Sequence, residues 1–172
     1  ASEFNQAIAG AQAGDRLEIA AANLSNLSIG SKNFSGAGIT ITAASGYDPV
    51  IEIITVSNSS GITFQDLTFF RTTGNSWDNA ATFTNCHDIT VNGCDIHSSI
   101  DSNYNNDKDG LEFAGGYNLT ISNNEFTNVG IGVYVRNADN VTVSNNTVHD
   151  LGGDAFDFNN IRNSQITGNL GY

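Results

Sequence analysis

The stretch NLTISNNEF occupies residues 118–126, and it returns as NVTVSNNTV at residues 140–148. A third, degenerate copy, NSQITGNLG, fills residues 163–171, so the copies begin 22 and then 23 residues apart. Each copy is a short run of alternating β-branched residues followed by two turn residues. A fixed period of this length is typical of a solenoid, in which each repeat packs only against its neighbours.

Each period contains three short segments of alternating apolar residues. The strand in the quoted copies corresponds to ITF at 62–64 and ITV at 89–91 earlier in the chain. Another segment precedes each strand, and its last residue is in turn Val56, Phe83, Phe113, Val135 and Phe158. A third follows the turn residues, as LTFF, CDIH, NEFT and NTVH. Since alternation places one face inside, we expect an all-β fold: a right-handed parallel β-helix of about six coils, with three short strands per coil.

The paired asparagines mark the bend between the second and third strands. Asn124, Asn146 and Asn169 share one register there. Stacked asparagines can hydrogen-bond to the backbone of the coils above and below, so their amide groups can be satisfied inside the core. We therefore expect a buried asparagine ladder.

The two ends of the chain depart from the repeat. Apolar residues recur at helical spacing near the start, at Phe4, Ala7, Ile8 and Ala11. We expect a short helix that ends by Gly14 and caps the first coil, as a solenoid requires. No such cap follows before Tyr172, so we expect residues 1–172 to be a single β-helix domain of a longer secreted protein. The bare last coil predicts end-to-end self-association.

The composition argues against two classes of partner. The 18 acidic residues outnumber the 6 basic ones, which gives a net charge of −12. Nucleic acids are bound through cationic contacts with phosphates, so we expect no nucleic-acid partner. No apolar run approaches the ~20 residues of a membrane span, so we expect no membrane insertion.

Cys86 and Cys94 lie at opposite ends of a predicted strand, 88–93, and we expect two buried, unpaired thiols.

Two long connections interrupt the repeat between a third strand and the next first strand. They are RTTGNSWDN at 71–79 and SSIDSNYNNDKD at 98–109, and both are expected to leave the solenoid on the same side. Solenoids concentrate function in such insertions. The connections carry Trp77 and Tyr104, and exposed aromatic rings beside carboxylates suit a groove that binds sugars.

The outer face of the first-strand sheet, beside these connections, is predicted to be charged. Two outward registers are expected, one of Glu112, Tyr134 and Asp157 and the next of Ala114, Arg136 and Asn159. Three more acids lie close by, namely Asp107, Asp109 and Asp154. Neighbouring coils are about 4.8 Å apart, so these carboxylates would repel one another unless a cation compensates. In the alternative interpretation, Arg136 pairs with Glu112 or Asp157 on an ordinary acidic surface.

The coil layout, the asparagine register, the predicted helix before GDRLEI (14–19) and the phrase DGLEFAGGYNLTISNNEF (109–126) resemble the pectate-lyase-like β-helix superfamily. That superfamily includes polysaccharide lyases, mannuronan C-5 epimerases and non-catalytic modules. The resemblance implies a groove along the first-strand sheet. There, calcium or a cationic group neutralises the carboxylate of an acidic sugar, and a base removes the C-5 proton.

The resemblance also implies a role for each charged residue of this face. Arg136 or Lys108 would be the base and Tyr134 the acid. Calcium would be held by Asp107, Asp109, Glu112 and Asp157, because it prefers hard oxygen ligands. Substrate would be bound by Trp77, Tyr104, Asp154 and Asn159. We therefore expect a secreted, calcium-dependent lyase or epimerase acting on an acidic polysaccharide. The alternative is a non-catalytic carbohydrate-binding, adhesion or structural module of a larger secreted protein.

Overall fold

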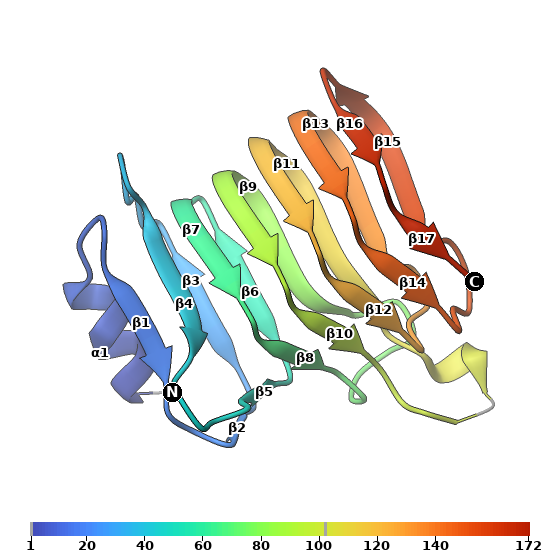
Figure 1. Ribbon diagram of the computed structural model, residues 1–172, viewed down its shortest axis with the longest axis horizontal. Coiled ribbons are helices and arrows are strands. Elements are labelled where there is room, and N and C mark those ends of the chain that lie inside the picture. The colour runs from blue at the N-terminus through green and yellow to red at the C-terminus, as the bar shows by residue number, and fades with distance from the viewer. Residues whose placement is uncertain (1, 102) are drawn as a thin grey trace.

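The computed structural model describes residues 2–101 and 103–172 of the chain. It confirms the predicted all-β fold, a parallel β-solenoid of about six turns with one short N-terminal helix. The coils stack side by side along the long axis, from the blue N-terminal end to the red C-terminal end (Figure 1). Strands of neighbouring coils pair in parallel throughout the two sheets.

The successive coils contribute strands to both of the two sheets. The main path of the ten-stranded sheet is β1 (Arg16–Ile19), β4 (Ile39–Ala43), β7 (Ser60–Gln65), β9 (Asn79–Asn92), β11 (Asp109–Ser122), β13 (Val133–Ser144) and β15 (Phe156–Arg162). Beside this path lie β3 (Leu27–Gly30), β6 (Ile54–Ser57) and β16 (Gln165–Thr167). The seven-stranded sheet is β2 (Asn23–Leu24), β5 (Val50–Ile51), β8 (Thr68–Phe70), β10 (Asp95–His97), β12 (Glu125–Thr127), β14 (Thr147–His149) and β17 (Leu170–Gly171).

In the later coils the predicted first and second strands run on as one long strand. β9 and β11 are each 14 residues long and β13 is 12. Each long strand bends at residues with positive φ, such as Asn137 and Asn140, both at 54°. Asparagine adopts this left-handed conformation more readily than most residues. The chain therefore turns a corner here without the strand being divided.

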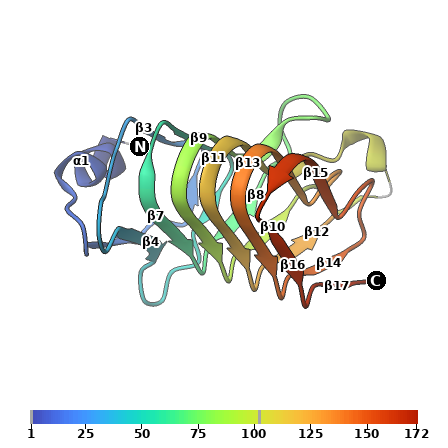
Figure 2. The same cartoon turned by 90° about the horizontal axis from the view of Figure 1, so that it is seen from above.

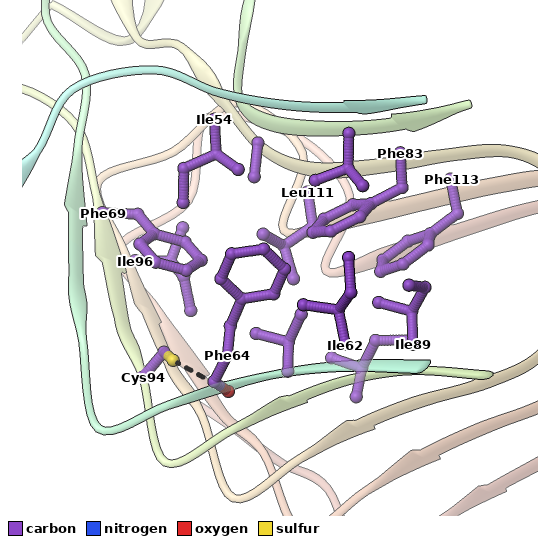
Figure 3. Close-up of a cluster of buried hydrophobic side chains, with 14 of the residues drawn as sticks. Ile54, Ile62, Phe64, Phe69, Phe83, Ile89, Cys94, Ile96, Leu111 and Phe113 are labelled. Atoms are coloured by element: carbon purple, nitrogen blue, oxygen red, sulfur yellow. Dashed lines mark hydrogen bonds between the residues drawn. The ribbon is translucent and has the colours of Figure 1, made fainter. Parts of the chain in front are cut away.

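The inward side chains fill the interior with stacked rows of apolar groups. Phe83 and Phe113 are paired in register, and their rings stack with centroids 4.4 Å apart. Phe64 meets Phe83 edge to face in the same cluster, shown in Figure 3. Cys86 and Cys94 are buried and unpaired, as predicted. Burial raises the pKa of the Cys94 thiol to about 12, so this side chain is an inert part of the core.

The predicted asparagine ladder is confirmed, with Asn169 at its partly exposed end. Asn124 and Asn146 are buried, and the Oδ1 of Asn146 accepts from the backbone N and the Nδ2 of Asn124, both at 2.9 Å. The Nδ2 of Asn146 donates to the carbonyl of Ile121 at 3.0 Å and to the Oδ1 of Asn169 at 2.9 Å. The preceding asparagine of each pair, Asn123 or Asn145, has positive φ. One asparagine therefore turns the backbone, and the next bonds the coils together.

The predicted N-terminal cap is also confirmed. Helix α1 (Ser2–Gly10) lies across the first coil, and Ile8 is buried in the core (Figure 2). At the other end, Ile166, Leu170 and Tyr172 are exposed. End-to-end association through this coil stays a prediction. Across the described residues, no helix has the length and apolar character needed to cross a membrane.

Candidate binding cleft

A cleft of about 500 Å³ opens where the two long connections leave the solenoid. These connections join β8 to β9 and β10 to β11, and both project from the same side (Figure 2). Short turns of the next two coils complete the walls. The lining residues are Ser76, Trp77, Tyr104, Asn105, Asp107, Asp109, Gly130, Ile131, Gly152, Gly153 and Asp154. Five residues of the predicted site therefore meet in one hollow.

The first connection presents Trp77 on a braced loop. Trp77 is 75% exposed, although it is the largest apolar side chain of the chain. Arg71, largely buried at the base of the loop, donates to the carbonyls of Thr73 and Asn79 and to the carboxylate of Asp78. The same carboxylate accepts from the backbone N of Asn75 at 2.7 Å. Arg71 was not predicted from the sequence to have a role here, yet its hydrogen bonds hold this loop in place.

The second connection presents Tyr104 from a single turn of 3₁₀ helix, η1 (Tyr104–Asn106). Tyr104 is 60% exposed. Ser98 ties the loop down, because its Oγ donates to the carbonyl of Arg71 at 2.9 Å and accepts from the backbone N of Lys108 at 3.1 Å. The Nζ of Lys108 donates to the carbonyl of Asn106 at 2.8 Å, and the side chain is buried. Lys108 therefore closes the loop and does not line the cleft.

Two buried carboxylates form one wall of the cleft. Asp107 is only 4% exposed, and its Oδ1 is the one buried side-chain oxygen or nitrogen without a partner among the described residues. Burial raises its pKa, and the charge of Asp101 raises it further. Asp109 is also buried, and its Oδ1 accepts from the backbone N of Ile131 at 2.8 Å. Burial raises the pKa of Asp109, with a further rise from Glu112.

Glycines make room for these carboxylates, a feature that sequence reasoning missed. A Cβ on Gly130 would lie 2.6 Å from the Oδ1 of Asp109, and one on Gly153 would lie 2.8 Å from the carbonyl of Gly130. Both distances are too short for a side chain. In the sequence, the Gly-Gly pair at 152–153 and the two glycines at 130 and 132 indicated that the backbone packs closely here.

The remaining predicted residues lie on the outer face of the ten-stranded sheet, beside the cleft. Arg136 pairs with Glu112, at 2.8 Å from Nη2 and 3.0 Å from Nε to the same oxygen, as the alternative interpretation expected. Asn79 donates to the other oxygen of Glu112 at 3.0 Å. Arg136 is therefore engaged by a carboxylate on this face. Tyr134 lies in register between Glu112 and Asp157, and Asn159 lies beside Arg136.

The four predicted calcium ligands are divided between these two places. Asp107 and Asp109 line the cleft, whereas Glu112 and Asp157 belong to the outer face. Within the part of the chain that the structure describes, no three His, Cys, Asp or Glu side chains are grouped to hold a metal ion. The structure therefore does not bring the four predicted calcium ligands together at one place.

A smaller hollow of about 350 Å³ lies between α1 and β1. Its walls are mainly apolar, with Phe4 and Leu17 among them, and its charged residues include Arg16 and Glu18, which pair with each other at 3.2 Å. Arg16 and Glu18 are thus occupied by each other, unlike the oxygen of Asp107. The chemistry of the molecule is concentrated in the larger cleft.

The fold and the cleft together define a parallel β-solenoid with a lateral cleft. The family model described as "Right handed beta helix region" matches residues 52–171. The chain belongs to this family, and membership of the pectate-lyase-like superfamily is consistent with the match. No curated protein and no solved structure matches the chain.

Proposed function

We propose that this β-helix domain binds a carbohydrate, and that the saccharide occupies the cleft between the two connections. The observation that carries the proposal is the exposure of Trp77 and Tyr104 at a cleft whose walls also hold carboxylates. A flat aromatic face stacks on a sugar ring, and carboxylate oxygens accept hydrogen bonds from hydroxyl groups. Arg71 and Ser98 hold the two loops in place, so little conformational entropy is lost on binding.

Isothermal titration calorimetry with oligosaccharides of neutral, acidic and basic sugars tests this proposal. Trp77→Ala should weaken binding of the preferred oligosaccharide by about tenfold or more, since a stacked aromatic anchor is lost. Tyr47→Ala is the matched control, because Tyr47 is exposed but lies outside the cleft. Unchanged affinity in Trp77→Ala, or no binding of any oligosaccharide, would overturn the proposal.

A second candidate is the lyase or C-5 epimerase on an acidic polysaccharide, and the outer face favours it. Arg136 is partly exposed there beside Tyr134, so the pair could meet a uronate carboxylate and its ring oxygens. Absorbance of the new double bond on alginate, pectate and chondroitin tests the lyase, and proton NMR of the product tests the epimerase. Arg136→Ala should abolish activity. Arg162→Ala should retain it, because Arg162 forms a similar exposed pair with Asp139.

Calcium binding by Asp107, Asp109, Glu112 and Asp157 stays a prediction. If it occurs, calcium should raise the melting temperature, because a ligand that binds only the folded state stabilises it. A chelator that leaves the melting curve of the purified protein unchanged, together with no effect of added calcium, would contradict it. Secretion is likewise a proposal, and it follows from a polysaccharide ligand outside the cell.

A further inference from the structure

The charged groups that line the cleft are all acidic. They are Asp107, Asp109 and Asp154, and none of the described lining residues carries a positive charge. The basic side chains beside the cleft are engaged elsewhere, Lys108 with the carbonyl of Asn106, Arg136 with Glu112 and Arg71 with Asp78. The net charge of −12 adds to the negative potential of this surface. The cleft is therefore complementary to a cation.

The unpartnered oxygen of Asp107 points to the same kind of ligand. Asp107 is 4% exposed, and its Oδ1 has no hydrogen-bond donor in the described chain. A carboxylate oxygen withdrawn from water without a donor is costly, and a charged donor compensates it better than a neutral one. The Oδ2 lies 3.7 Å from a Cβ built on Gly152, a residue that lines the cleft. The carboxylate thus lies at the wall of the cleft, beside Gly152.

Resting on the proposed function, we propose that the saccharide is an amino sugar, whose protonated amine is received by Asp107 and Asp154 while its ring stacks on Trp77. An ammonium group donates to carboxylate oxygens and neutralises their charge at once. Indole and phenol rings also attract cations through their faces, so Trp77 and Tyr104 favour the same ligand. An oligouronate without a bridging cation would place like charges together, which disfavours binding.

Three oligosaccharides of equal length separate these possibilities by calorimetry at about pH 6. The probes are oligomers of glucosamine, of N-acetylglucosamine and of galacturonate. The first two share the same sugar ring and differ in the acetyl group, which removes the charge of the nitrogen. We expect the glucosamine oligomer to bind about tenfold or more tightly than its acetylated counterpart, and the galacturonate oligomer to bind least.

Charge variants of the protein distinguish recognition from attraction to an acidic surface. Asp107→Asn/Asp154→Asn should reduce the affinity for the glucosamine oligomer to that of the acetylated oligomer. Asp95→Asn/Glu125→Gln removes the same charge from the seven-stranded sheet and should leave the preference intact. Because Asp154 is exposed, Asp154→Asn alone provides a variant that leaves the core untouched.

The outcomes also separate this inference from the proposed function. Equal affinity for the acetylated and free amine oligomers would overturn the amino-sugar assignment but leave carbohydrate binding in place. Tighter binding of galacturonate, with or without calcium, would overturn it in favour of an acidic ligand. Oligolysine that binds as tightly as the glucosamine oligomer would overturn it as non-specific attraction. Failure of all three saccharides to bind would overturn the proposed function itself.

Discussion

Two places in this solenoid bury polar side chains, and they differ in how those groups are satisfied. At the bend between the sheets, Asn124 and Asn146 are buried, and their side-chain amides bond to the coils on either side. At the cleft, Asp107 and Asp109 are equally buried, but one oxygen of Asp107 has no partner among the described residues. The buried amides of the first place find their hydrogen-bond partners within the fold, whereas the second place leaves one carboxylate oxygen without a donor.

The difference follows from the period of the chain. At the bend, the last three coils carry an asparagine in the same register, so the side-chain amides of Asn124 and Asn146 each meet an acceptor one coil away. The connections that bear Asp107 and Trp77 occur once each, so no neighbouring coil supplies a matching group. Proteins depart from such local consistency at functional sites. The break in the repeat is therefore the position at which a ligand can complete the hydrogen bonding.

The largest expected effect is the loss of one step of the ladder. Asn146→Ala removes two donated and two accepted hydrogen bonds and leaves buried backbone groups unpaired. We expect a loss of about 2–3 kcal/mol in the free energy of unfolding, measured by denaturant titration. Asn159→Ala, on the exposed outer face, should change it by less than about 0.5 kcal/mol. Equal stability of the two variants would remove the distinction between the ladder and an ordinary surface.

The opposite sign is expected at the cleft. Asp107→Asn should stabilise the protein on the order of 1 kcal/mol at neutral pH, since it removes a buried charge that lacks a partner. Burial raises the pKa of Asp107 in the folded state, so the unfolded chain releases its proton first as the pH rises. The penalty is present above the raised pKa, and it disappears below the ordinary range for aspartate, about 3.9. Denaturant titration of both proteins between neutral and acidic pH measures it, and a destabilised variant at neutral pH would contradict this assignment.

The smallest effect on stability is expected at the rim of the cleft. Trp77 is 75% exposed and contributes little to the core, so Trp77→Ala should change the free energy of unfolding by less than about 0.5 kcal/mol. The melting temperature should therefore match that of the unaltered protein. A clear fall would show that Trp77 packs on its loop and is not held available for a ligand.

The repeat explains why much of the fold could be predicted. Aligning NLTISNNEF with its copies fixes the registers, so the stacking of Glu112, Tyr134 and Asp157 followed directly and is confirmed by the strand pairing. The positive φ of Asn123 and Asn145 was not predicted, although asparagine before the ladder residue was its signal. The repeat period determines which residues share a face of the solenoid. It does not determine how deeply an individual side chain is buried.

The site could be predicted only in outline, because it lies where the period fails. The connections and their aromatic residues were identified, but the path of a loop depends on contacts that have no counterpart in other coils. Lys108 was expected to be available for chemistry, and it is buried in the loop. Arg71, which braces the loop of Trp77, follows a regular strand and gave no signal of its role.

Fluorescence of Trp77 tests the central claim most directly, because it is the only tryptophan in the chain. Titration with the glucosamine oligomer should shift its emission to shorter wavelength, since a stacked sugar replaces water around the exposed indole. The change should saturate at the dissociation constant found by calorimetry, and it should weaken in Asp107→Asn/Asp154→Asn. Heat of binding without any change in the emission of Trp77 would show that the saccharide binds elsewhere and would contradict the account.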